Sequence, residues 1–123
     1  MNDAQTKLTL AGVLGKLVGR ELSSVTFVRD LIQLAFDGAG LNAYTLPTVT
    51  CGSERLTVKQ PGYRDCLCEQ IGHRVQRTEV DGQCVSIVFE NGPVVSISLR
   101  DDDYRGPEAL EFWLDRRDCV WVV

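Results

Sequence analysis

The stretch Ser86–Leu99, SIVFENGPVVSISL, decides the fold that this sequence predicts. Apolar and small polar residues alternate on both sides of ENGP, which is typical of a half-buried β-hairpin. Asn91-Gly92 at its centre favours a two-residue type I′ turn, which needs a positive φ at both central residues. The chain is therefore expected to fold back on itself here as two antiparallel strands.

A second stretch, Gln33–Leu46 (QLAFDGAGLNAYTL), carries the same apolar pattern 53 residues earlier. Without gaps, this shift aligns Phe36 with Phe89. We interpret the similarity as an internal duplication within a single domain, 1–123, with copies at about 8–46 and 61–99. The alternative is a chance similarity between two amphipathic hairpins.

Each predicted unit consists of a helix, a strand and a hairpin. In the second unit, apolar residues at helical spacing over 62–71 end at Gly72, and residues 74–80 then alternate as a strand. The first unit follows the same order, with its helix at 9–18. Because one hairpin and one helix bury too little apolar surface to be stable, two units are expected to close one core.

After the second hairpin, Pro107 follows Gly106 and predicts a short C-terminal helix in which Phe112 and Trp113 face the core. The alternative is that these two aromatic residues form a binding patch. The last residues, CVWVV, predict a final strand buried on both faces. The predicted fold class is α+β: a mainly antiparallel sheet built from two repeated helix–strand–hairpin units, plus a short C-terminal helix and a final strand.

The acidic excess of the chain lies in one segment. The net charge is −4, and residues 101–118 alone hold seven acids and three bases. An acidic surface without a basic stripe argues against nucleic acid and favours a basic protein as partner. The predicted partner-binding residues are Asp101, Asp102, Asp103, Tyr104, Glu108 and Glu111. The alternative is an ordinary solvated loop.

No motif predicts catalysis, a cofactor or a metal. Cys66 and Cys68 are two residues apart on the predicted helix, so their thiolates point in different directions and cannot grip one ion. The only histidine, His73, follows a predicted helix end, where a protonated imidazole would meet the helix dipole favourably. The sequence therefore predicts no enzyme.

The cysteine count and the apolar runs bear on location. The five cysteines are an odd number, which with no export signal predicts reduced thiols in the cytoplasm. No apolar run reaches the roughly 18 residues that a membrane helix needs, so no membrane association is expected.

Three segments carry a resemblance: GRELSSVTFVRDLIQLAFDG at 19–38, FENGPVVSISLRDDDYRGPEALEF at 89–112, and the closing VWVV. They resemble small stand-alone bacterial proteins in which a strand ends in Phe, an acid or Asn, and Gly. In these proteins a second strand ends in Leu and is followed by an acidic turn and Gly-Pro-Glu-Ala. In size and acidity such proteins resemble the immunity proteins of polymorphic or contact-dependent toxin systems. The resemblance covers most of the chain from Leu17 on and transfers no functional residue.

The resemblance implies a cytoplasmic immunity protein that neutralises a cognate, basic toxin domain by direct binding. The alternative is a small homo-oligomeric or small-ligand-binding module without catalysis. In either case we expect a monomer or a dimer.

Overall fold

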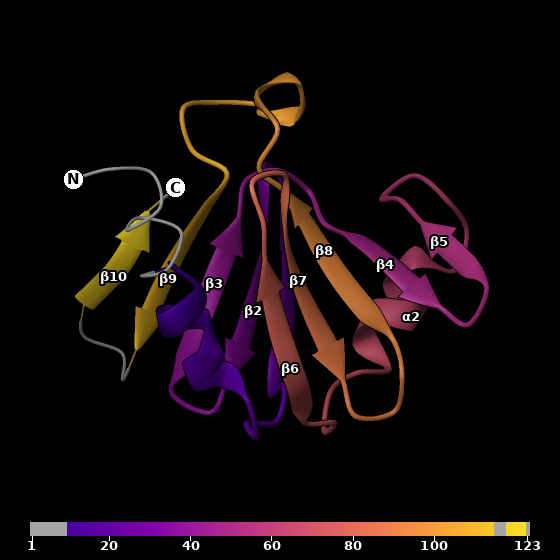
Figure 1. Ribbon diagram of the computed structural model, residues 1–123. Coiled ribbons are helices and arrows are strands. Elements are labelled where there is room, and N and C mark those ends of the chain that lie inside the picture. Colours follow the sequence, from indigo (N-terminus) through magenta and orange to yellow (C-terminus); the bar gives the residue numbers. More distant parts are fainter. Residues whose placement is uncertain (1–9, 115–117, 123) are drawn as a thin grey trace.

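The computed structural model describes residues 10–114 and 118–122, which form two antiparallel five-stranded sheets packed face to face (Figure 1). In chain order the elements are η1 (Gly15–Leu17), β1 (Ser24–Val28), β2 (Leu31–Phe36), β3 (Ala39–Ala43), β4 (Thr48–Cys51), β5 (Glu54–Leu56), α2 (Tyr63–Cys68), β6 (Val75–Val80), β7 (Cys84–Phe89), β8 (Val94–Ser98), η2 (Asp101–Asp103), β9 (Leu110–Leu114) and β10 (Asp118–Val122). The predicted α+β class with mainly antiparallel strands is confirmed in this general form.

The strands are arranged as β1-β2-β3-β9-β10 in sheet 1 and as β5-β4-β8-β7-β6 in sheet 2. Inward side chains of both sheets meet in one apolar cluster that contains Phe36, Phe89 and Phe112, each 0% exposed. Outward side chains alternate with them, as the two-residue period of a strand requires. The prediction that Phe112 belongs to the core is therefore confirmed.

The same prediction is wrong for Trp113, which takes the opposite face of β9 and lies half-buried over Gly40 of β3. A Cβ on Gly40 would overlap the indole ring and lie 2.7 Å from the carbonyl oxygen of Leu34. Glycine at this position thus lets the indole rest directly on the backbone of the sheet.

The predicted C-terminal helix is wrong, because the segment after Pro107 forms strand β9. Leu110 and Phe112 face the core while Glu111 faces outward, which is a two-residue period. Phe112 lies opposite Leu41 of β3. The open edge of β3 offers a ladder of backbone hydrogen bonds to this segment, and tertiary pairing of this kind overrides a local helix-start signal. The predicted final strand forms as β10, paired with β9.

The two complete helix–strand–hairpin repeats are not supported, and one reason lies in the turns. Asp37 and Gly38 form a two-residue turn with φ values of 48° and 92°, as a type I′ turn requires. The second hairpin turns over three residues, 90–92, and only Gly92 has a positive φ. The type I′ turn predicted at Asn91-Gly92 is therefore wrong.

The extra residue changes which side chains correspond. Leu41 and Val95 face the core, so the inward positions of the second hairpin strands are 54 residues apart. A gapless shift of 53 aligns Leu41 with Val94, which is only half-buried. A slip of one residue moves a side chain to the other face of a sheet, so the simple repeat fails after the turn.

The helices also differ between the two halves. Residues 10–14 are α-helical and continue into the 3-10 turn η1, whereas α2 covers only Tyr63–Cys68. Residue 9, the first of the predicted helix 9–18, lies outside the described residues. Neither segment matches the ten-residue helix that the sequence predicts.

One local correspondence does occur at the expected spacing, where residues 19–22 cross residues 72–75. The Gly19 N–H donates to the Val75 carbonyl at 2.9 Å, and the Gly72 N–H donates to the Leu22 carbonyl at 2.8 Å. The Leu22 and Val75 N–H groups likewise donate to the carbonyls of residues 73 and 20, each at 3.0 Å. We call this reciprocal set of four hydrogen bonds the crossing.

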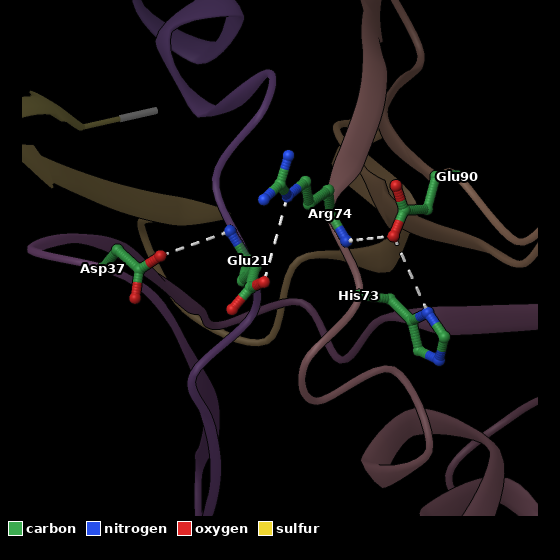
Figure 2. A network of polar contacts seen from close by, with 5 residues as sticks. All are labelled: Glu21, Asp37, His73, Arg74 and Glu90. Atoms are coloured by element: carbon green, nitrogen blue, oxygen red, sulfur yellow. Dashed lines mark hydrogen bonds and ion pairs between the residues drawn. The ribbon is translucent and has the colours of Figure 1, made fainter.

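Side chains around the crossing form a similar reciprocal pattern of hydrogen bonds and ion pairs (Figure 2). The Glu21 N–H donates to Asp37 Oδ2 at 3.4 Å, and the Arg74 N–H donates to Glu90 Oε1 at 3.2 Å. Glu21 and Arg74 pair with each other as an antiparallel bridge, with Oε1 of the glutamate 3.8 Å from Nε of the arginine. His73 Nδ1 lies 3.9 Å from Glu90 Oε1. The carboxylates of the two hairpin turns thus hold the two strands of the crossing.

Helix α2 packs beside β4 and is fastened to it in two ways. Tyr63 is 1% exposed, and its hydroxyl donates to the Pro47 carbonyl at 2.6 Å. Cys66 is joined by a disulfide to Cys51 at the end of β4. The prediction that all cysteines are reduced is therefore wrong for this pair. The packing of α2 against β4 brings the two Cα atoms to 6.7 Å, which is a separation that a disulfide can span.

The crossing generates a first prediction. Gly19 and Gly72 have φ values of 87° and 92°, which strain any other residue. Gly19→Ala and Gly72→Ala should each lower the free energy of unfolding by about 1 kcal/mol or more in urea titrations. Gly12→Ala is the matched control, because Gly12 is helical and has open space around it. Unchanged midpoints for both crossing variants would contradict the assigned conformation.

The disulfide generates a second prediction. Proteolysis without reductant should release one linked peptide pair containing Cys51 and Cys66. The bridge spans 15 residues, for which chain entropy predicts about 3 kcal/mol of stabilisation. Dithiothreitol should therefore destabilise the wild type, while Cys51→Ala should be insensitive to it and Cys68→Ser should behave like wild type. Alkylation of both Cys51 and Cys66 in the native, unreduced protein would contradict the bridge.

Tyr63 generates a third prediction, on pH. Burial raises the pKa of Tyr63 from 10.0 to about 12. The unfolded tyrosine ionises first, so its contribution to stability is complete below pH 10 and is lost as the pH rises from 10 towards 12. Tyr63→Phe should cost about 1 kcal/mol at neutral pH through the lost hydrogen bond, and its difference from wild type should shrink in urea titrations above pH 10. A difference that stays constant between pH 8 and pH 11 would show that Tyr63 is not shielded from water.

Candidate functional site

The predicted acidic residues Asp101, Asp102 and Asp103 form η2, one 3-10 turn in the connection that arches above β8 in Figure 1. All three are exposed. The Ser98 hydroxyl donates to Asp103 Oδ2 at 2.6 Å, and the Arg100 N–H donates to Ser98 Oγ at 3.1 Å. Asp103 is thereby tied to the end of β8. Within the described residues, Asp101 and Asp102 have no ion pair.

Tyr104 follows η2 and is half-buried. Burial raises the pKa of Tyr104, and the negative charge of Asp101 raises it further. The hydroxyl therefore stays protonated at neutral pH and can donate a hydrogen bond beside the acidic turn.

Glu108 and Glu111 have a different setting, near the outer face of sheet 1. Glu111 Oε1 accepts hydrogen bonds from Asn42 Nδ2 at 3.0 Å and from the Tyr44 hydroxyl at 3.3 Å. Gln33 Nε2 extends this ladder by donating to Asn42 Oδ1 at 3.0 Å. Burial, followed by the charge of Glu111, raises the pKa of Tyr44, and Glu108 adds to the effect. The Glu111 carboxylate thus forms hydrogen bonds within its own sheet.

A groove of about 740 Å³ that the sequence did not reveal lies on the outer face of sheet 2. Small side chains from three adjacent strands line it: Thr48 and Thr50 of β4, Cys84 of β7, and Ser96 and Ser98 of β8. The strand register explains the hollow, because Thr48 lies opposite Ser96, and Cys84 lies opposite Ser98. Short side chains side by side leave the sheet surface low.

Larger polar residues stand around this floor. Arg55 of β5 lies opposite Thr50, while Asp81, Gln83, Arg100 and Asp103 gather where β7 begins and β8 ends. Asp103 therefore belongs both to the predicted acidic turn and to the groove. The sequence signal for the groove is the alternation T-V-T, C-V-S and S-I-S, whose outward residues are small and polar.

The two carboxylates at the groove already have partners in the protein. Asp81 Oδ1 accepts hydrogen bonds from the backbone N–H groups of Gln83 at 2.7 Å and Cys84 at 2.9 Å, and Asp103 accepts the Ser98 hydroxyl. By contrast, Arg55 and Arg100 form no ion pair within the part of the chain that the structure describes. The two guanidinium groups can therefore pair with acidic groups of a ligand, while the two carboxylates keep their negative charge.

Among the residues that the structure describes, the other side chains with reactive groups are His73 and two free thiols. His73 belongs to the crossing, where Glu90 is its ion-pair neighbour. The free thiol of Cys84 lies 3.7 Å from Ser86 Oγ, and the free thiol of Cys68 is exposed on α2. Over residues 10–114 and 118–122, no three His, Cys, Asp or Glu side chains are placed to hold a metal ion. The same residues include no helix with the length and apolarity to cross a membrane.

Comparison of the chain with protein-family models, with curated proteins and with solved structures finds no match.

Proposed function

We propose that this chain acts by binding and not by catalysis, as an immunity protein whose acidic turn docks onto a basic, cognate toxin domain. One observation carries the proposal: Asp101 and Asp102 are exposed on a short 3-10 turn and have no ion pair among the described residues. Unpaired charges that project from one end of a molecule attract a partner of opposite sign.

The physical role of such a turn is to speed encounter. Complementary charges at the rim of an interface raise the association rate more than they raise final affinity. Salt screens exposed charges with a Debye length of about 8 Å at physiological ionic strength. Binding by the turn should therefore be strongly salt-dependent, while the fold should not depend on it.

The toxin-immunity role rests on the resemblance of the segments at 19–38 and 89–112, and the cytoplasmic location is part of the same proposal. The Cys51–Cys66 disulfide is the observation that speaks against that location, because stable disulfides are typical of oxidising compartments. Binding through the acidic turn does not depend on the compartment, provided that the chain and its partner meet there.

A second candidate function is the binding of a small or elongated ligand without catalysis. The groove on sheet 2 favours it, because its volume lies within the roughly 300–1,000 Å³ of ligand sites. The two functions use different residues, apart from Asp103, and can be tested separately.

The test of the first function is a charge-neutral double variant, Asp101→Asn with Asp102→Asn, which leaves the groove residue Asp103 intact. Because exposed charges typically change stability by less than about 0.5 kcal/mol, the melting temperature should stay nearly the same. Association with the product of the adjacent gene should slow at low salt and lose much of its salt dependence. Stopped-flow mixing at two ionic strengths measures both.

The matched control is Glu54→Gln with Glu69→Gln, which removes the same charge from exposed positions outside η2. This control should associate at a rate close to that of wild type. Equal rates for both double variants at low salt would reject the acidic turn as the docking site. Failure of the adjacent product to bind the wild type would reject it as the cognate partner.

A further inference from the structure

The floor of the groove offers hydroxyl groups in register on neighbouring strands. Thr48 and Ser96 lie opposite each other in the lining. Ser96 Oγ lies 3.4 Å from Oγ of Ser86, which is paired with it on β7 and stands outside the lining. Each hydroxyl can donate one hydrogen bond and accept others. A ligand that carries many hydroxyls of its own matches this mixture of donors and acceptors.

The groove lining holds two carboxylates and two guanidinium groups, and they differ in their partners within the protein. Asp81 and Asp103 are occupied by protein donors, whereas neither Arg55 nor Arg100 is ion-paired within residues 10–114 and 118–122. A guanidinium binds carboxylate, sulfate or phosphate oxygens by charge-assisted hydrogen bonds. The ligand should therefore carry acidic groups in addition to hydroxyls.

The positions of the two arginines set the length of the ligand. Arg55 lies in the row of Thr50 and Val94. From Val94 to Ser98 strand β8 advances about 13 Å, at roughly 3.3 Å per residue, and Arg100 lies beyond Ser98. The groove thus has one cationic contact towards each end, and a ligand that meets both must be elongated.

We propose that the groove binds an acidic oligosaccharide that lies along β4 and β8. Its hydroxyls contact Thr48, Thr50 and Ser96, and its acidic groups contact Arg55 and Arg100. Among the described residues of the lining, Leu46 is the one large apolar side chain, so recognition depends on hydrogen bonds and charge and not on ring stacking. This site shares Asp103 with the acidic turn, but it does not rest on the proposed immunity function.

The reactivity of a cysteine thiol can report whether the groove is occupied. Cys84 is a free thiol in the lining of the groove, and Cys68 is a free, exposed thiol on α2 outside that lining. The probe is a short oligogalacturonide, a sugar chain with one carboxylate per unit. At saturation it should slow the reaction of Cys84 with iodoacetamide at least about fivefold and leave Cys68 unchanged, as peptide mass spectrometry measures for each cysteine.

Affinity measurements on variants locate the contact. Arg55→Gln and Arg100→Gln should each weaken binding roughly tenfold, the loss expected for one charge-assisted hydrogen bond. Thr48→Val, which replaces a hydroxyl with a methyl group of similar size, should weaken it several-fold. Arg77→Gln is the matched control, because Arg77 is exposed on β6 and pairs with Glu79 outside the groove lining. Circular dichroism checks that every variant is folded.

Three further outcomes would overturn the proposal. Absence of Cys84 protection at millimolar oligogalacturonide would show that the groove does not take this ligand. Equal protection by a neutral malto-oligosaccharide of the same length would show that the arginines are not used for charge. Equal protection by oligoglutamate, weakened by the same arginine variants, would assign the groove to acidic peptides. The expected result is strong protection by oligogalacturonide and weak protection by the other two probes.

Discussion

The reciprocal hydrogen bonds of the crossing fix how the two sheets face each other. Residues 19–22 lead into β1, and residues 72–75 lead into β6, so each edge strand starts from the same junction. Apolar burial is non-directional and would tolerate several sliding positions of one sheet over the other. Four directional backbone bonds choose one of them, and the core side chains can then pack at the density that a unique structure needs.

Much of the sheet structure can be read from the sequence, because strand alternation is a local signal. The hairpin strands around Phe36 and Phe89 were predicted, and both rings are buried. The predictions are wrong where a contact between residues distant in the sequence determines the local structure. The segment after Pro107 carries a helix-start signal but pairs as a strand with the open edge of β3. The turn after Phe89 is one residue longer than the two-residue turn that Asn91-Gly92 predicts. The Cys51–Cys66 bridge depends on how α2 docks, which residue spacing does not reveal.

The candidate sites also differ in how far the sequence alone predicts them. A run of three aspartates predicts an exposed acidic turn directly, and the structure places them on η2. The sequence does not reveal that Glu111 belongs to a hydrogen-bond ladder on sheet 1 and not to the acidic turn. Its partners Asn42 and Tyr44 come from β3 and from the residue after β3. The groove requires β4 to lie beside β8, and Thr48 and Ser96 are remote in the sequence. Until that pairing is known, T-V-T and S-I-S indicate only the solvent faces of two strands.

The crossing also has a consequence for the order in which the protein folds. It joins Leu22 to Gly72, so it closes a loop of 50 residues, whereas β2–β3 and β7–β8 close loops of two or three. Loop closure costs entropy before any contact repays it, and chains dominated by distant contacts fold slowly. The two hairpins can form early, each with one apolar face still in contact with water. The slow step is then their meeting, and during that interval the exposed hairpin faces are the part of the chain most open to association with other molecules.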